Sequence, residues 1–220
     1  MEGSVINIVR IVGRDAEVKH ALMMLCSINP NHLITKAISK ELNYTLEDNS
    51  WELINWDKDN VPFDFKLVTN SSIKFKTHGD SPYDTLLMLS EYNPNVYITV
   101  YYTEEDFGVS AGIYKFIEGE EIDYYSPKSC TKEATELSLS IIDDDSYLFT
   151  YINDLEEEEL QDGINGSDEV INTLIVHIYK NKILTDLYPI ELQEYLLNLA
   201  IEEEDYEYAA ELKKVLDSAY

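Results

Sequence analysis

Alternating apolar and polar positions mark several short strands in the first half of the chain. The clearest run, Val96–Tyr102, is also rich in β-branched and aromatic residues, and we expect it at the centre of a sheet. Val109–Ile117 is expected to pair with it across a polar connection. The other candidate strands are Ser4–Val12, Trp51–Asn55, Phe63–Val68 and Ile73–Thr77.

Helical segments are interleaved with these strands. One helix is expected from Asp15 to about Ser27, and Thr35–Leu42 is ambiguous but suits a short helix. Ser81 and Pro82 signal another helix start, with Ser81 as cap and Pro82 in the first turn. The order predicts an α+β, ferredoxin-like domain over residues 1–125, with two helices on a mostly antiparallel sheet.

The pattern is less decisive in residues 126–166, which we interpret as an acidic extension. Apolar residues alternate on either side of Asp143–Asp145, which favours a β-hairpin with an acidic tip. A helix over Lys132–Ile142 competes with that interpretation. Asp154–Asp168 is strongly acidic, contains two glycines and is expected to be a linker or an exposed loop.

Helical periodicity returns in residues 167–220. Ser167–Glu169 opens a helix, Asn181 closes it, and Pro189 begins the next. Two apolar stripes then predict a C-terminal helical hairpin with a polar corner at Glu202–Asp205. The stripes consist of Leu192, Leu196, Leu199 and Ala200, and of Ala209, Leu212, Val215 and Leu216.

Charge is the strongest compositional feature of the chain. The formal net charge is −27, and residues 120–220 alone carry 26 acidic and 6 basic side chains. Direct binding to DNA or RNA is disfavoured, because affinity for phosphates comes from Lys and Arg, and anionic membranes are disfavoured for the same reason. A protein partner with a basic surface is favoured. Acidity that serves only solubility is the alternative.

The sequence gives no sign of secretion or membrane insertion. Cys26 and Cys130 show no pairing pattern, which fits a reducing compartment. The N-terminal apolar run contains Asn7 and Arg10 and does not resemble a signal peptide, and no apolar run approaches the ~18–20 residues of a spanning helix. We therefore expect an intracellular, cytoplasmic protein.

Searches for catalytic motifs return nothing above background. No glycine-rich phosphate loop or nucleophile elbow is present, and the four histidines are scattered. The acidic runs do not alternate as a calcium loop requires. We expect no enzyme activity, no cofactor and no metal site.

Two sets of short motifs stand out along the chain. Between Trp51 and Gly119 these are Asn55-Trp56, Phe75-Lys76-Thr77, Ser81-Pro82, Asn93-Pro94, Tyr101-Tyr102, Glu104 or Glu105, and Gly112. In this pattern the segment resembles a small ferredoxin-like family of unknown function from phage and plasmid accessory proteins, which implies a mobile-element setting and a bacterial host cell.

The second set lies in the C-terminal hairpin and consists of Asp205, Tyr206, Glu207, Ala209, Ala210, Leu212 and Leu216. In these residues the hairpin resembles the UVR motif, which implies protein–protein contact.

These observations define an expected function and an expected surface. We expect a non-enzymatic accessory protein that inhibits or modulates a host nucleic-acid-binding protein, its carboxylates imitating phosphates. An adaptor, scaffold or virion-associated protein that docks a helical partner through the hairpin is the alternative. The oligomeric state is left open. The expected partner-binding residues are Asp143, Asp144, Asp145, Glu156, Glu157, Glu158, Glu159, Glu202, Glu203, Glu204, Asp205, Tyr206, Tyr208, Leu212 and Leu216.

Overall fold

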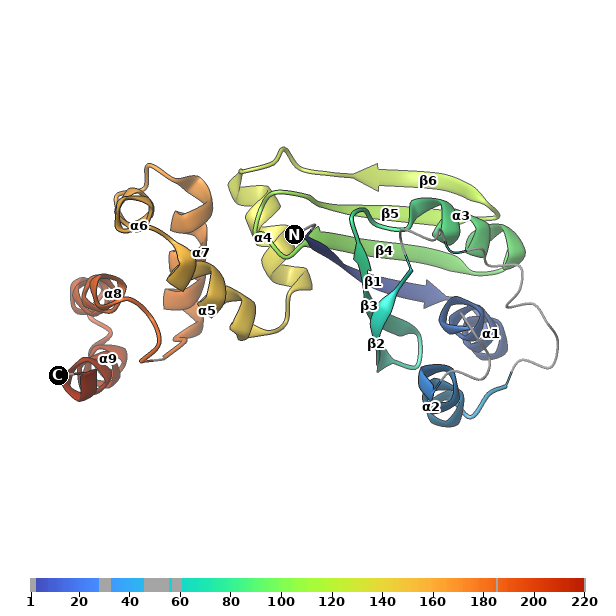
Figure 1. Ribbon diagram of the computed structural model, residues 1–220, viewed down its shortest axis with the longest axis horizontal. Coiled ribbons are helices and arrows are strands. Elements are labelled where there is room, and N and C mark those ends of the chain that lie inside the picture. Colours follow the sequence, from blue (N-terminus) through green and yellow to red (C-terminus); the bar gives the residue numbers. More distant parts are fainter. Residues whose placement is uncertain (1–2, 28–32, 46–55, 57–60, 185, 220) are drawn as a thin grey trace.

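An antiparallel sheet and a group of helices lie side by side in the computed structural model (Figure 1). The structure describes residues 3–27, 33–45, 56, 61–184 and 186–219. The strand expected at Trp51–Asn55 lies outside these residues. The strands are β1 (Ser4–Val12), β2 (Phe63–Thr69), β3 (Ser72–His78), β4 (Tyr97–Glu104), β5 (Ala111–Ile117) and β6 (Glu120–Tyr125). The helices are α1 (Asp15–Cys26), α2 (Leu33–Leu42), α3 (Tyr83–Tyr92), α4 (Lys132–Ile141), α5 (Asp145–Asp154), α6 (Glu157–Ile164), α7 (Glu169–Asn181), α8 (Ile190–Glu202) and α9 (Tyr206–Ala219).

The α+β class and the antiparallel sheet are confirmed, and the sheet has more strands than the β-α-β-β-α-β pattern of a ferredoxin-like unit. The strand order is β2-β3-β1-β4-β5-β6, and β4 is an inner strand, as its composition predicts. One face of the sheet packs on α1–α3 through Val9, Ile98 and Phe116, all fully buried. This burial follows the two-residue period of the strands, which sends alternate side chains to the helix-covered face.

One cap was assigned wrongly from the sequence. Pro82, not Ser81, occupies the N-cap position of α3, and no side chain caps that helix end. Ser81 instead donates a hydrogen bond from Oγ to Oδ1 of the fully buried Asn7, at 2.8 Å. Asn7 donates in turn to Oγ1 of Thr77 at 3.0 Å. A buried amide needs such partners, and this requirement draws Ser81 toward the sheet.

Strand β6 was missed because its connection to β5 lacks an Asn-Gly or Asp-Gly signal. Glu118 and Gly119 both have positive φ, 53° and 76°, as a tight hairpin turn between twisted strands requires. Glycine adopts this conformation readily, whereas Glu118 does so at some cost. All six residues of β6 are exposed, so the strand has no buried apolar face to reveal it.

Residues 126–166 correct the sequence interpretation. The expected hairpin around Asp143–Asp145 is the pair of helices α4 and α5, and the competing helix over Lys132–Ile142 is confirmed by α4. Helix α4 buries Ala134, Thr135, Ser138 and Ile141, whereas Leu137 and Leu139 are only half-buried. Small and polar residues therefore carry its helical period, while the larger leucines alternate on its flank and imitate a strand.

The expected loop at Asp154–Asp168 contains helix α6. Three of its four acidic residues, Glu157–Glu159, stand in the first turn, where carboxylates offset the helix dipole. Gly163 is buried against Ile171 of α7, and a Cβ built at Gly163 would lie 2.1 Å from Cγ2 of Ile171. Here glycine permits close packing of two helices; it does not break the first of them.

The last three helices agree with the sequence interpretation. Asp168 caps α7 by accepting a hydrogen bond from the amide of Ile171 at 2.9 Å, and α8 and α9 form the predicted hairpin. Helix α7 buries Ile171, Leu174, Ile175 and Ile178 in a second hydrophobic core. Ile6 and Phe107 join this core from the sheet side, so the helices and the sheet are packed together. Among the described helices, none is long and apolar enough to cross a membrane.

Candidate partner-binding surface

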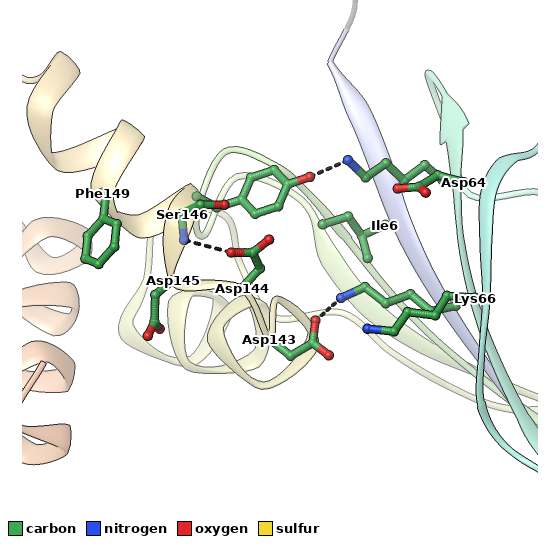
Figure 2. A pocket seen from close by; sticks show the side chains of 11 residues that line it. Ile6, Asp64, Lys66, Asp143, Asp144, Asp145, Ser146 and Phe149 are labelled. Atoms are coloured by element: carbon green, nitrogen blue, oxygen red, sulfur yellow. Dashed lines mark hydrogen bonds and ion pairs between the residues drawn. The ribbon is translucent and has the colours of Figure 1, made fainter.

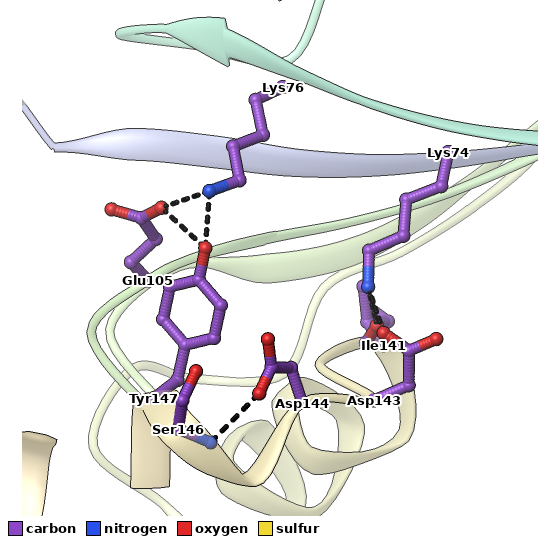
Figure 3. A network of polar contacts seen from close by, with 8 residues as sticks. All are labelled: Lys74, Lys76, Glu105, Ile141, Asp143, Asp144, Ser146 and Tyr147. Carbon is purple, nitrogen blue, oxygen red and sulfur yellow. Dashed lines mark hydrogen bonds and ion pairs between the residues drawn. The ribbon is translucent and has the colours of Figure 1, made fainter. Parts of the chain in front are cut away.

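Asp143 is held by the sheet and is not a free surface charge. Its carboxylate pairs with the ammonium group of Lys74 on β3, and Lys74 also reaches the carbonyl oxygen of Ile141 at 3.4 Å (Figure 3). The hydrogen bond from Lys74 keeps the pKa of Asp143 below its usual value. This acid therefore anchors the connection between α4 and α5 to the sheet.

A second contact ties the start of α5 to the sheet. Lys76 donates to Oε1 of Glu105 at 3.0 Å, and the hydroxyl of Tyr147 donates to the same oxygen at 3.2 Å (Figure 3). Lys76 and the Tyr147 hydroxyl also contact each other directly. Because Lys76 is largely buried, an isolated ammonium there would be costly, and Glu105 supplies the compensating charge.

These contacts line a pocket of about 530 Å³ between β2–β3 and the start of α5 (Figure 2). Its walls carry Lys66, Lys74 and Lys76 on one side and Asp143–Asp145 on the other. Asp144 turns back to accept a hydrogen bond from the amide of Ser146 at 2.9 Å, and its interactions with the side chain and then the backbone of Ser146 lower its pKa. Two of the three aspartates thus have structural partners, while Asp145 is exposed in the first turn of α5.

Glu156–Glu159 form the start of α6. Glu156 is the N-cap residue, and its amide donates to Oε2 of Glu159 at 2.9 Å, which completes a capping box. Glu157 and Glu158 make no such contact and are exposed. Of this cluster, the capping pair is fixed by local structure, and the other two carboxylates face solvent.

An acidic pocket that the sequence did not indicate lies beside this cluster. It measures about 560 Å³ and is lined by four carboxylates, with Tyr147 and Tyr151 in its wall. Two of these acids lie in the loop after β4, and the other two lie much later in the sequence, at the end of α5 and in the first turn of α6. The carboxylates are those of Glu105, Asp106, Asp154 and Glu159. Only the packing of α5 and α6 beside that loop brings them together.

The corner between α8 and α9 combines acidic and aromatic exposure. Glu202–Glu204 are exposed, whereas Asp205 accepts a hydrogen bond from the amide of Tyr208 at 3.2 Å and pairs with Lys182 at 2.9 Å. The hydrogen bond with Lys182 lowers the pKa of Asp205. Tyr206 is 66% exposed and projects from the corner. Glu202–Glu204 and Tyr206 therefore remain available to a partner.

The other hairpin residues expected at the surface lie in the interior. Tyr208, Leu212 and Leu216 are 0%, 3% and 8% exposed, so the expectation that they form a contact surface is wrong in this folded arrangement. Their spacing places them on the stripe of α9 that faces the rest of the hairpin. Tyr206 and Tyr208 do point in different directions, as their separation predicts.

The acidic residues of the second half are almost uniformly surface groups. Within the described residues from 120 onward, every Asp and Glu is exposed except Asp168 and Asp205, which are half-buried. Ion pairs among the described residues engage only four of these acids, with Lys74, Lys115, Lys132 and Lys182. The described residues from 120 onward therefore present a large negative surface, most of whose carboxylates have no ion-pair partner among the described residues.

Among the described residues, no group of three or more His, Cys, Asp and Glu side chains is arranged to hold a metal ion. Cys26 is buried in the first core, and burial raises the pKa of its thiol, which disfavours the reactive thiolate. Burial lowers the pKa of His177, and the side chain of Asn181 lies 3.3 Å from its Nδ1.

The Asp143–Lys74 pair has a predictable pH dependence. Because the pKa of Asp143 is lower in the folded protein, the pair stabilises the fold above the unfolded value of about 3.9 and loses this effect as the pH falls through the lowered pKa. Asp143→Asn is expected to reduce the free energy of unfolding by up to ~1 kcal/mol near neutral pH, since the carboxylate is solvent-screened. Urea denaturation at a series of pH values would measure this difference in the free energy of unfolding.

Asp186→Asn is the matched control, because Asp186 is also exposed and forms no ion pair within the described residues. Both variants should converge with the wild type at low pH. An Asp143→Asn effect that persists unchanged in strong acid would contradict the pairing.

No family model matches the chain, and neither a curated protein nor a solved structure is detectably similar to it. A fold alone does not determine function, so the chemistry of the surface carries the evidence for it.

Proposed function

We propose that this protein is a non-enzymatic accessory protein of a phage or other mobile element, acting in the cytoplasm of a bacterial host. It binds a basic surface on a host nucleic-acid-binding protein and thereby inhibits or modulates it. The observation that carries the proposal is the exposed, largely unpaired acidity of residues 120–220. A charge distribution of this kind attracts basic partners over long range and opposes nucleic acid.

The acidic pocket gives the proposal a local binding chemistry. Carboxylates of Asp106, Asp154 and Glu159 surround space in which a partner's Lys or Arg side chain would fit. Tyr151 is held there by an edge-to-face contact with Phe107, with ring centroids 5.5 Å apart. Charged hydrogen bonds between guanidinium and carboxylate groups are among the stronger polar contacts in interfaces.

Mimicry of nucleic acid is the mode of inhibition that we favour. Duplex DNA carries one negative charge per ~1.7 Å of its axis, and a groove that binds it is lined by Lys and Arg. Several acids of the proposed surface are fixed at helix ends. They lie at the starts of α5 and α6 and at the corner between α8 and α9. Fixed carboxylates can bind such a groove with less loss of conformational freedom than a disordered acidic tail.

The fold proposal is a ferredoxin-like unit followed by an acidic helical region. The element order β1-α1-β2-β3-α3-β4 supports this assignment, with α2, β5 and β6 as additions. We propose that the chain consists of this ferredoxin-like unit over residues 1–125, an acidic extension over residues 126–166 and a helical region over residues 167–220. The resemblance to phage and plasmid proteins supports the setting.

An adaptor role is the second candidate. Ile201 and Tyr206 are 50% and 66% exposed at the α8–α9 corner, and together they offer an apolar anchor within an acidic rim. A helical partner docked there would depend less on salt than a basic groove would. The buried residues Tyr208, Leu212 and Leu216 would hold the two helices of the hairpin in place beneath this surface.

Affinity capture from bacterial cells, with and without infection, distinguishes the two candidates. We expect basic nucleic-acid-binding proteins to be retained at ~50 mM salt and lost by ~500 mM, because screening weakens contacts between exposed charges. Duplex DNA added at low salt should elute the same proteins. A partner that stays bound at high salt and ignores DNA would favour the adaptor and contradict mimicry.

A further inference from the structure

The two edges of the sheet are built differently. Edge strand β2 pairs with β3 in a register broken at two places, and Asp64 within it has a positive φ of 55°. Lys66 lies between these irregularities. Bulges and lysines are the usual means by which an edge strand is protected from pairing with another chain.

Edge strand β6 lacks such lysines, and its charged residues are acidic instead. Its sequence, Glu120–Tyr125, contains neither Lys nor Pro, and its ladder with β5 has one register shift. On its outer side no described strand pairs with it. Ile122, Tyr124 and Tyr125 are each about half exposed, at 49%, 51% and 49%. An uncovered strand with apolar side chains is a template for a further strand.

Strand β6 is also held in position before any partner arrives. Tyr124 stacks on Tyr114 of β5 with ring centroids 5.0 Å apart, and Asp123 pairs with Lys115 at 2.6 Å. The tight turn at Glu118 and Gly119 fixes one end. A preformed template lowers the ordering cost of strand addition.

We propose that β6 is a docking edge to which an extended segment of another protein, with Lys or Arg alternating with apolar residues, adds as a seventh strand. In such a complex the backbone hydrogen bonds supply affinity and the side chains supply selectivity. Pairing with β5 places Glu120 and Asp123 on one face of β6, where they offer carboxylates to cations, and Tyr124 on the other face, where it offers an apolar surface. This surface is separate from the acidic helices and goes beyond their proposed role.

Charge selects the basic segment over a second copy of this chain. Two copies would bring together molecules of net charge −27 each, and three of the six residues in each β6 strand would be acidic. Like charges near one another across strands are destabilising. A basic segment meets the same strand with opposite charge.

The test uses the full-length protein and a synthetic peptide, as long as β6, in which lysine and valine alternate. Its control is the same peptide with every backbone amide N-methylated, which keeps the charge and removes the donors. We expect the unmodified peptide to bind about tenfold more tightly or better, because strand addition depends on backbone hydrogen bonds. Amide exchange should slow selectively at residues 120–125. Equal affinities, or protection confined to the acidic helices, would overturn the proposal.

Two protein variants sharpen the result. Glu120→Lys should weaken the unmodified peptide severalfold, whereas Glu133→Lys, an equal charge change at an exposed site on α4, should not. The triple variant Glu157→Gln, Glu158→Gln, Glu203→Gln should retain the difference between the peptides even if it no longer captures cellular partners. Concentration-dependent dimerisation that protects residues 120–125 without peptide would instead identify a second copy as the occupant and reject the basic segment.

Discussion

Tyr208→Ala is expected to lower the free energy of unfolding of the helical region by about 3–5 kcal/mol, the range for removing a buried aromatic ring. Tyr208 is 0% exposed, and its ring meets that of Tyr179 at 5.8 Å between centroids. The cavity would open where α7 and α9 meet, which the remaining side chains can fill only in part. Thermal and chemical denaturation followed by circular dichroism would measure the loss.

Two substitutions control this result. Tyr206→Ala should change stability little, because that ring is 66% exposed. Tyr208→Phe should preserve or raise stability by up to ~1 kcal/mol, since the Tyr208 hydroxyl has no hydrogen-bond partner among the described residues. If Tyr206→Ala proved the more damaging substitution, the assignment of inner and outer faces of α9 would be wrong.

The second large effect concerns binding. Replacing Glu157, Glu158 and Glu203 together with Gln is expected to weaken partner capture by about tenfold, because association with a basic surface depends on this charge. All three carboxylates are exposed and none caps a helix through its side chain. Titrating immobilised variants with the captured partner would give the ratio of dissociation constants.

The matched control replaces Glu41, Glu91 and Glu118 with Gln. These residues are exposed on the sheet half, so net charge changes equally while the helical surface is intact. Circular dichroism would confirm that both variants are folded. Equal weakening by both variants would show that total charge matters and the helical surface does not, which would contradict a localised binding site.

Most of the sheet could be predicted from the sequence because its strands bury one face. Alternation is clearest in β4, where it reflects the side that packs on α1–α3. Strand β6 lacks a buried face, and the sequence therefore contains no alternation signal for it. The inner position of β4 follows from its β-branched and aromatic residues.

The acidic helices could not be predicted in the same way. In α4 three of the four buried positions are small or hydroxyl-bearing, such as Thr135 and Ser138, whose burial depends on partners across the fold. Ser138 accepts a hydrogen bond from the hydroxyl of Thr103 at 2.8 Å, a contact between positions distant in the sequence. Local hydropathy cannot show such compensation.

The local sequence also could not show which acidic residues of the candidate surface have partners within the fold. Glu156–Glu159 are typical of a solvated loop by composition, yet their position at a helix start gives them a favourable electrostatic environment. Asp143 was predicted as a partner-binding residue, but pairing with Lys74 depends on how α4 packs against the sheet. The sequence identified the charge correctly and could not assign each carboxylate to an internal or external partner.

The most direct test of the account is displacement of nucleic acid from the captured partner. The protein would be titrated into a complex of that partner with fluorescently labelled duplex DNA, at several salt concentrations between ~50 and 200 mM. We predict that it releases the DNA competitively and that the Gln variant of Glu157, Glu158 and Glu203 does so much less well. A stable ternary complex, with the DNA still bound at saturating protein, would contradict the claim that its acidic helices occupy a nucleic-acid-binding surface.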